Sequence, residues 1–329
     1  MSDVAELNRR IEAEAELFDQ IVQEVGRVIV GQQELVQRLL IGLLSGGHLL
    51  LEGVPGLAKS LAVETLARTL DVSFRRIQFT PDMLPADIVG TPVFQPATGR
   101  FEVKRGPIFA QLILADEVNR APAKVHSALL QAMQEQQVSI GDETFALPQP
   151  FLVLATQNPI EHEGTYPLPE AELDRFLLKV VLDYPSLEEE VRIVERMART
   201  GGLPEVRAVA DGGRILAARK LVDDVYVDER RVMYALALIR ATRDPAAVGL
   251  TDLVEAIRYG ASPRASIALV LAARTHALLR GRGFATPADV KAMAVSVLRH
   301  RILLTYEAQA DGVHRADLVQ RILDRVEVP

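Results

Sequence analysis

Cysteine is absent from the 329 residues of this chain. Its absence excludes disulfides, thiolate metal sites and cysteine nucleophiles together. No apolar run approaches the length of a membrane span, and residues 1–6 (MSDVAE) are acidic where a signal peptide is basic and apolar. No low-complexity tract occurs either. We therefore expect a cytoplasmic globular protein with no membrane span.

Basic residues are fewer than acidic ones, 37 against 44, so the formal net charge is −7. A surface with this balance does not attract nucleic acid or anionic membranes nonspecifically, so a nucleic-acid partner is not expected, although a local basic channel stays open. Apolar residues make up 49% of the chain and charged residues 25%, which is typical of a globular protein. The length allows a sizeable core and two domains.

Residues 49–60 (LLLEGVPGLAKS) are the segment around which the rest of the sequence is organised. A short apolar run suited to a buried strand ends at Glu52, a loop of small residues follows, and Lys59 and Ser60 open a helical segment. A phosphate-binding loop requires this order, since its backbone N–H groups and the helix dipole face an anion. We expect Lys59 to reach the β- and γ-phosphates and Ser60 to ligate Mg²⁺. The structural alternative is an ordinary strand-to-helix turn with a surface lysine.

One position departs from the standard loop pattern, since Ala58 replaces the usual glycine before the lysine. Alanine is tolerated there if its φ is negative. Just upstream, Val30 and Gly31 end an apolar patch that is either a backbone contact for an adenine ring or simply a helix start. The expected nucleotide-binding residues are Val30, Gly31, Gly53, Val54, Pro55, Gly56, Leu57, Ala58, Lys59, Ser60, Leu61 and Asp116.

Acidic and amide side chains follow two later apolar strands. Asp116 and Glu117 stand at the end of the predicted strand 112–115, and Asn158 follows the predicted strand 151–156. Ligands of open α/β sheets bind at the carboxyl ends of the strands, where the phosphate loop also lies. We expect Asp116 to hold Mg²⁺ through water and Glu117 to orient the attacking water; two acids capping a strand end are the alternative. Asn158 can bond a γ-phosphate or the lytic water, but asparagine before proline is also ordinary turn chemistry.

Two predicted hairpins interrupt the alternation of strands and helices. The first spans residues 91–109 with its turn at 96–99, and the second spans 138–147 with Gly-Asp at its turn. Insertions on a rigid scaffold often carry specificity. Strand patterns largely stop at Pro185, and Ser186 with Glu189 forms a capping box for a new helix. The expected domains are residues 1–185, with an N-terminal helix and both hairpins, and residues 186–329, a linker and a helical domain.

Two arginines are candidate phosphate ligands. Ser262 as N-cap and Pro263 as first helical residue place Arg264 in a first turn, where a cation opposes the helix dipole. Either a phosphate or a nearby carboxylate is expected to hold it. Arg175 follows Asp174 and either forms an internal ion pair or, in an oligomer, projects into a neighbour's nucleotide site.

Several longer blocks of sequence occur together in one order, which is far more specific than a lone phosphate loop. They are residues 53–60 (GVPGLAKS), 78–87 (QFTPDMLPAD), 115–122 (ADEVNRAP), 155–159 (ATQNP), 164–171 (GTYPLPEA) and 260–264 (GASPR). On these blocks the chain resembles the MoxR family of AAA+ ATPases from about Ile21 to Leu303, and alanine is usual in that family's loop. The resemblance implies an α/β AAA+ P-loop NTPase domain with a five-stranded parallel sheet, followed by an all-helical lid domain, assembled as a hexameric ring.

The resemblance also implies roles for individual residues. Lys59 with Ser60 resembles the Walker A pair, and Asp116 with Glu117 the Walker B pair. Asn158 resembles sensor 1, Arg264 resembles sensor 2, and Arg175 resembles the arginine finger that acts in the adjacent subunit, with Arg120 as a competing candidate. The two hairpins look like the helix-2 insert and the pre-sensor-1 insert. The implied catalytic residues are Glu117, Asn158, Arg175 and Arg264, and the implied Mg²⁺ ligands are Ser60 and Asp116.

The function that the resemblance implies is Mg²⁺-dependent ATP hydrolysis coupled to chaperone-like work on a partner protein. The implied partners carry a von Willebrand factor A domain or a metal cofactor. Two other functions stay open. A nucleic-acid remodelling ATPase needs a basic channel, which only Lys104 and Arg105 suggest. A nucleotide-gated binding module with little hydrolysis keeps Lys59 but has no need of Glu117.

Overall fold

The computed structural model describes residues 2–54, 56–158, 166, 168–198, 200–201 and 204–328. Contacts divide the chain into two compact units. Unit 1 comprises Met1–Phe18, Phe176–Lys179 and Ala217–Pro329, and unit 2 comprises Asp19–Arg175 and Val180–Leu216. The domain boundary expected at residues 185 and 186 stays a prediction. Among the described residues, no helix combines the length and apolar character needed to cross a membrane.

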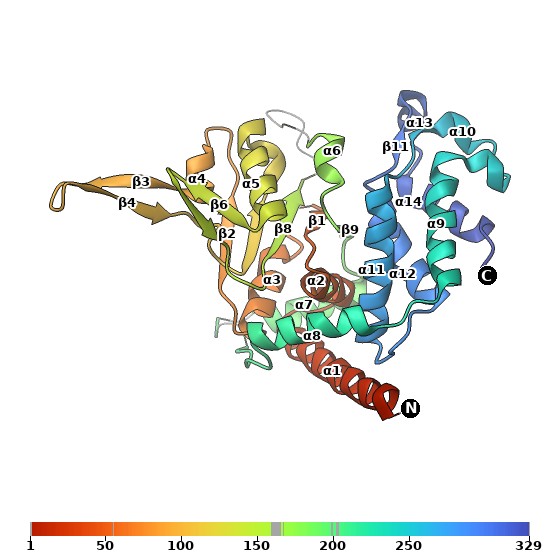
Figure 1. Ribbon diagram of the computed structural model, residues 1–329, viewed down its shortest axis with the longest axis horizontal. Helices are drawn as coiled ribbons and strands as arrows, with labels where there is room; N and C mark the ends of the chain where they lie inside the picture. The colour runs from red at the N-terminus through yellow and green to blue at the C-terminus, as the bar shows by residue number, and fades with distance from the viewer. Residues whose placement is uncertain are drawn as a thin grey trace. The chain divides into compact units, whose positions relative to one another are not determined.

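A five-stranded sheet organises unit 2, and its strand order is β2-β5-β8-β1-β9 (Figure 1). The strands are β1 (Leu49–Glu52), β2 (Phe74–Gln78), β5 (Leu112–Asp116), β8 (Leu152–Gln157) and β9 (Leu178–Val181). The pairs β1 with β8, β8 with β5 and β5 with β2 are parallel. Residues 49–51, 112–115 and 152–155 are buried without interruption, as in central parallel strands covered on both faces. The predicted sheet is confirmed, and it brings the carboxyl ends of β1, β5 and β8 together.

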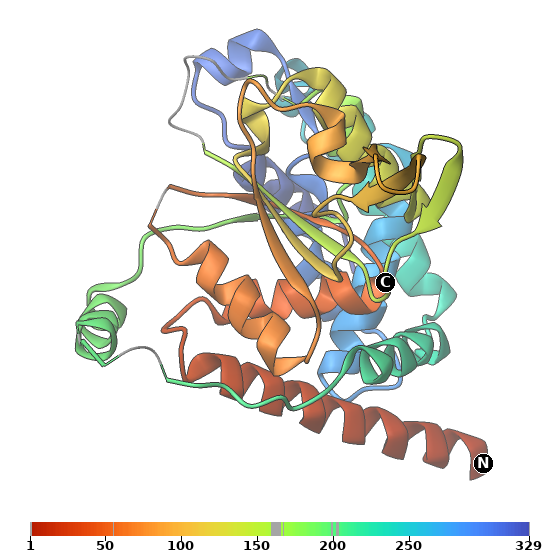
Figure 2. The same ribbon diagram turned by 90° about the vertical axis from the view of Figure 1, so that its left-hand side faces the viewer.

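The helices of unit 2 follow the predicted alternation with strands, and α3 lies along one side of the sheet (Figure 2). They are α2 (Gln33–Ser45), α3 (Lys59–Thr69), α4 (Pro85–Val89), η1 (Val118–Arg120), α5 (Ala123–Glu135), α6 (Glu170–Leu173) and α7 (Leu187–Met197). Two further helices, α1 (Ser2–Gly26) and α8 (Gly212–Asp224), have residues in both units. Ser186 and Glu189 form the predicted capping box of α7, since each side chain bonds the other's backbone N–H. Local capping chemistry therefore begins this helix where the sequence places it.

Both predicted hairpins are present. The first pairs β3 (Gly90–Gln95) with β4 (Arg100–Arg105), and the second pairs β6 (Gln137–Ile140) with β7 (Glu143–Ala146). The β3–β4 hairpin projects away from the sheet (Figure 1), and its opposed Phe94 and Phe101 are both exposed. At its base, a Cβ atom on Gly90 or Gly106 would overlap the backbone of the facing segment. The Gly106 N–H also donates to the Val89 carbonyl over 3.1 Å, so the chain enters and leaves the hairpin at one narrow point.

Unit 1 is mostly helical, as predicted. Its elements are α9 (Glu229–Arg243), η2 (Pro245–Val248), α10 (Leu253–Ala256), β10 (Ile257–Tyr259), α11 (Pro263–Leu279), α12 (Pro287–Leu298), β11 (Leu303–Leu304), α13 (Tyr306–Ala310) and α14 (Arg315–Arg325). The segment 252–259 contains α10 followed by β10, which pairs antiparallel with β11. The predicted N-cap of α11 is confirmed, because the Ser262 hydroxyl accepts a hydrogen bond from the Arg264 N–H over 3.2 Å.

A buried carboxylate fixes the start of α12. Asp289 is fully buried and accepts hydrogen bonds from His276 over 2.6 Å, from Arg282 over 2.5 and 2.7 Å, and from Thr286 over 2.7 Å. Burial alone raises the pKa of this carboxyl, but the hydrogen bonds outweigh burial and hold the pKa well below its usual range. Asp289 is therefore ionised and connects α11, the following loop and α12 within unit 1.

His300 and Arg301, which follow α12, form hydrogen bonds to the segment after Arg175. The buried Arg301 donates to the Phe176 carbonyl over 2.6 Å and to the Leu177 carbonyl over 3.1 Å. The His300 Nε2 lies 3.0 Å from the Phe176 carbonyl oxygen. Burial, with the nearby Arg301 charge, lowers the pKa of His300 well below its usual value, so the imidazole is neutral and Nε2 donates. These contacts explain why residues 176–179 group with unit 1.

Candidate functional site

The predicted phosphate loop joins the end of β1 to the start of α3. Lys59 is the first residue of α3, and its Nζ donates to the Gly53 carbonyl. Burial lowers the pKa of Lys59, while the charges of Asp116, Glu117 and Glu52 act in the opposite direction. The lysine is thus held in the loop among carboxylates that favour its charged form.

Ala58 adopts a left-handed conformation with φ 53°, so the negative φ under which alanine is readily tolerated here is not found. The loop needs this backbone conformation immediately before α3, whichever residue occupies the position. An L-residue with a Cβ adopts it at a cost of about 1 kcal/mol relative to glycine. The fold therefore stores a small strain at the start of the helix. Pro55, which was also predicted to bind nucleotide, lies outside the described residues.

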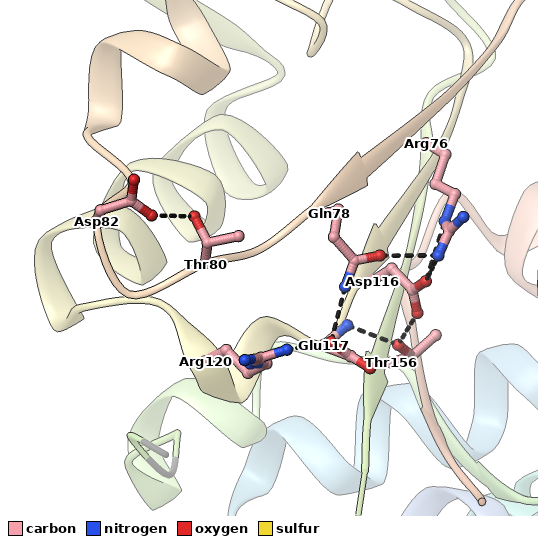
Figure 3. Close-up of polar contacts among 8 residues, drawn as sticks. All are labelled: Arg76, Gln78, Thr80, Asp82, Asp116, Glu117, Arg120 and Thr156. Atoms are coloured by element: carbon pink, nitrogen blue, oxygen red, sulfur yellow. Dashed lines mark hydrogen bonds and ion pairs between the residues drawn. The ribbon is translucent and has the colours of Figure 1, made fainter. Parts of the chain in front are cut away.

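The two predicted carboxylates extend from the end of β5 and are organised by a buried threonine of β8 (Figure 3). The Thr156 hydroxyl donates to Asp116 Oδ1 over 2.6 Å and accepts from the Glu117 N–H over 2.8 Å. Glu117 has a φ of 56°, so the backbone turns sharply directly after the strand. One hydroxyl therefore fixes the Asp116 carboxylate and the backbone of Glu117 together.

Residues of the edge strand β2 also bond these carboxylates (Figure 3). Arg76 donates to Asp116 Oδ2 through Nε over 3.0 Å and through Nη2 over 2.6 Å. Gln78 accepts from Arg76 over 2.8 Å and donates to Glu117 Oε2 over 2.7 Å. The residues predicted for the site from sequence do not include Arg76, Gln78 or Thr156. Strand alternation alone places Arg76 and Gln78 on one face, but it does not show which residues they meet.

These groups line a single cleft of about 400 Å³ in unit 2. The lining residues are Gly53, Gly56, Leu57, Ala58, Lys59, Ser60, Leu61, Arg76, Asp116, Glu117, Thr156, Gln157 and Asn158. The structure thus brings together the predicted loop, both predicted carboxylates and Asn158, from three different segments of the chain. Val54, the remaining predicted loop residue in the described range, does not contribute to this lining.

A second pocket of about 630 Å³ adjoins the loop and shares Gly56, Leu57, Ala58 and Leu61 with the cleft. Its other walls are residues 28–35, residues 180–185, and Glu189, Glu190, Ile193 and Met197 of α7. Val30 and Gly31 lie in this wall, as the predicted adenine contact requires. A Cβ atom on Gly31, whose φ is +68°, would lie 2.7 Å from a Glu189 carboxylate oxygen. Glycine is favoured here chiefly by this φ, and any other residue would also require the Glu189 carboxylate to shift.

The three predicted arginines lie in different settings. Arg120 of η1 bonds Glu117 Oε2 over 3.3 Å in the same chain. Arg175 lies two residues after the end of α6 and is exposed, and it is not among the cleft-lining residues in the described part of the chain. Arg264 is exposed in the first turn of α11 and belongs to unit 1, so its approach to the cleft stays a prediction.

The donor set of the cleft suits Mg²⁺ bound together with a nucleotide. A serine hydroxyl, a carboxylate and a lysine line the same space, and Mg²⁺ usually takes one or two protein oxygens, waters and substrate phosphates. Within the described ranges, no group of three or more His, Asp or Glu side chains forms an all-protein metal site. Ser60 and Asp116 are therefore the residues that could hold the ion, with phosphates completing its ligands.

Known proteins resemble this chain over most of its length. The family described as "ATPase family associated with various cellular activities (AAA)" matches residues 48–178, and the AAA lid domain matches residues 250–322. Chaperone MoxR1 of Mycobacterium tuberculosis is 50% identical over 96% of this chain and 84% of its own length. Protein MoxR of Paracoccus denitrificans is 32% identical over 92% of this chain and 93% of its own length.

A solved structure from Cytophaga hutchinsonii, described as a "putative ATPase", is 46% identical and has a TM-score of 0.92. The match covers 100% of this chain and 98% of that one, so the likeness extends over both compact units. With relatives of this identity over nearly its whole length, this chain belongs to the MoxR family of AAA+ ATPases.

Proposed function

We propose that this protein hydrolyses ATP with Mg²⁺ and couples hydrolysis to chaperone-like work on a partner protein. The observation that carries the proposal is the cleft in unit 2, which gathers Lys59, Ser60, Asp116, Glu117 and Asn158 around one space. Catalysis of phosphoryl transfer to water consists mostly of positioning the reactants and stabilising charge. It therefore uses a loop lysine, a hydroxyl and two carboxylates, as this cleft provides.

Each cleft residue has a distinct role in this proposal. Ser60 and Asp116, the Walker A and Walker B metal ligands, hold Mg²⁺, which neutralises phosphate charge when bound. Lys59 stabilises the negative charge that develops on the β- and γ-phosphates. Glu117 orients and polarises the attacking water, and Asn158 fixes that water or the γ-phosphate. The pocket beside Val30 and Gly31 holds the nucleobase.

The proposed partner and the proposed assembly rest on the membership of this chain in the MoxR family. One relative is named a chaperone, and we extend that activity to this chain as remodelling, maturation or activation of a partner. A von Willebrand factor A domain or a metal-cofactor protein is the proposed partner class, and the cytoplasm is the proposed location. A hexameric ring gives the exposed Arg175 its role, since it can then stabilise transition-state charge in the neighbouring subunit while Arg264 acts from the lid.

The test of a shared active site is the specific ATPase activity as a function of protein concentration. The native chain is compared with Arg175→Ala and with Arg9→Ala, an exposed arginine of α1 that pairs with Glu6. We expect activity per subunit to rise with concentration for the native chain and the control, and to stay low and flat for Arg175→Ala. Activity that is independent of concentration and survives Arg175→Ala contradicts the trans role, and Arg120 is then tested in the same way.

A further inference from the structure

We propose that Arg76 competes with Mg²⁺ for the metal-binding carboxylate of Asp116 and must leave it when Mg²⁺ enters with nucleotide. Arg76 then sets the concentration of free Mg²⁺ at which the site is loaded. The inference rests on the proposed function, because it takes Asp116 as a Mg²⁺ ligand.

The contacts of Asp116 leave little choice of carboxylate oxygen. Oδ1 accepts the hydroxyl of Thr156, a buried side chain that also holds the Glu117 backbone. Oδ2 is therefore the oxygen that an ion or its water can take without disturbing β8. Arg76 places both Nε and Nη2 on this Oδ2 atom (Figure 3). The guanidinium thus lies on the carboxylate oxygen that is not bonded to the buried threonine.

Charge makes the two occupants exclusive. Because a guanidinium carries a permanent positive charge, Arg76 gives up the carboxylate only by moving away. A divalent cation held on the same oxygen, directly or through water, would lie close to this fixed positive charge. Arg76 can move, since its side chain is 51% exposed on the edge strand β2, whereas Asp116 is only 15% exposed.

The expected size of the effect follows from the exposure of the pair. A partly exposed ion pair contributes only a small free energy to holding Arg76 on Asp116. Its removal should therefore lower the half-saturating concentration of free Mg²⁺ by roughly 2- to 5-fold rather than by orders of magnitude.

The alternative role for Arg76 is a direct phosphate ligand, because it lines the same cleft as Lys59. That role predicts the opposite sign, since removal of the arginine would weaken nucleotide binding.

The experiment measures equilibrium binding of the fluorescent nucleotide mant-ADP to the full chain, with free Mg²⁺ varied at fixed nucleotide and without turnover. Arg76→Gln removes the charge but keeps a polar side chain. Arg75→Gln is the matched control, since it makes the same charge change at the next position of the same strand, outside the cleft lining. Arg76→Lys keeps the charge without the two-pronged contact and should fall between native and Arg76→Gln.

We expect Arg76→Gln to load at roughly 2- to 5-fold lower free Mg²⁺ than the native chain, with Mg²⁺-free mant-ADP affinity unchanged and Arg75→Gln unshifted. An unshifted or raised Mg²⁺ requirement overturns the inference, and so does a fall in Mg²⁺-free affinity, which would make Arg76 a phosphate ligand. Failure of the native chain to bind mant-ADP at any Mg²⁺ concentration would refute the proposed function as well. Native binding with no shift in Arg76→Gln would refute the inference alone.

Discussion

Replacing Thr156 with valine tests whether a single buried hydroxyl organises the acidic end of β5. Thr156 is 2% exposed, and valine matches its shape while removing the oxygen. The change removes the 2.6 Å bond to Asp116 Oδ1 and leaves the Glu117 N–H without the acceptor that it has at 2.8 Å. A hydrogen bond to a charged group and an unsatisfied buried N–H cost about 1.5–3 and 1–3 kcal/mol respectively.

Because one hydroxyl serves both groups and solvent partly reaches Asp116, these two costs do not add fully. We expect Thr156→Val to lower the free energy of unfolding by about 2–4 kcal/mol, measured by urea titration with circular dichroism. The displaced carboxylates should also lower kcat for ATP by about 10-fold or more. Thr156→Ser is the control, because it keeps the hydroxyl and loses only a methyl group.

Two results would refute this reasoning. One is a Thr156→Val protein whose midpoint of urea unfolding and whose kcat both equal those of the native chain. The other is a Thr156→Ser protein that loses as much kcat as Thr156→Val, because the methyl group and not the hydroxyl would then position the carboxylates.

Three further predictions concern other parts of the chain. Glu117→Gln should retain ATP and lose about 100-fold or more in turnover, and normal turnover by equilibrium-binding and ATPase assays would show that the assigned base is wrong. Gly31→Ala should weaken mant-ADP binding about 10-fold, because alanine is strained at φ +68° and collides with Glu189; unchanged affinity would place the nucleobase elsewhere. Asp289→Asn should cost about 3 kcal/mol of unfolding free energy near pH 7. Hydrogen bonds hold the pKa of Asp289 in the folded protein below its value in the unfolded chain. Its contribution to the free energy of unfolding is therefore full above about pH 5 and is lost as pH falls towards the folded pKa. Urea titrations between about pH 5 and 2 should show a weaker pH dependence for the variant than for the native chain.

The sequence predicts those parts of the fold that depend on local patterns. Continuous apolar runs such as 112–115 predict central strands, because strands covered on both faces exclude polar residues. The Ser186 and Ser262 caps predict helix starts, because their hydrogen bonds span only two or three residues. The loop at 53–60 predicts the cleft, since the strand, loop and helix are contiguous.

Contacts between distant segments escape such patterns. Arg76 and Thr156 meet Asp116 from positions 40 residues away on either side, so the partners are set by sheet order and register rather than by any local signal. The β10–β11 pair is too short to show a strand period. The positive φ of Ala58 also escapes, because alanine at that position normally favours the right-handed region.

The narrow base of the β3–β4 hairpin has a consequence for how this protein can change. Gly90 and Gly106 bring the entering and leaving chain into backbone contact, so the ends of the insertion are already joined before its outer residues begin. Adding or removing residues beyond the base, within 93–102, therefore alters little of the closure entropy and does not shift β5 or the loop that follows β1. The reach and chemistry of the hairpin can diverge between relatives while the residues around Lys59 and Glu117 stay fixed.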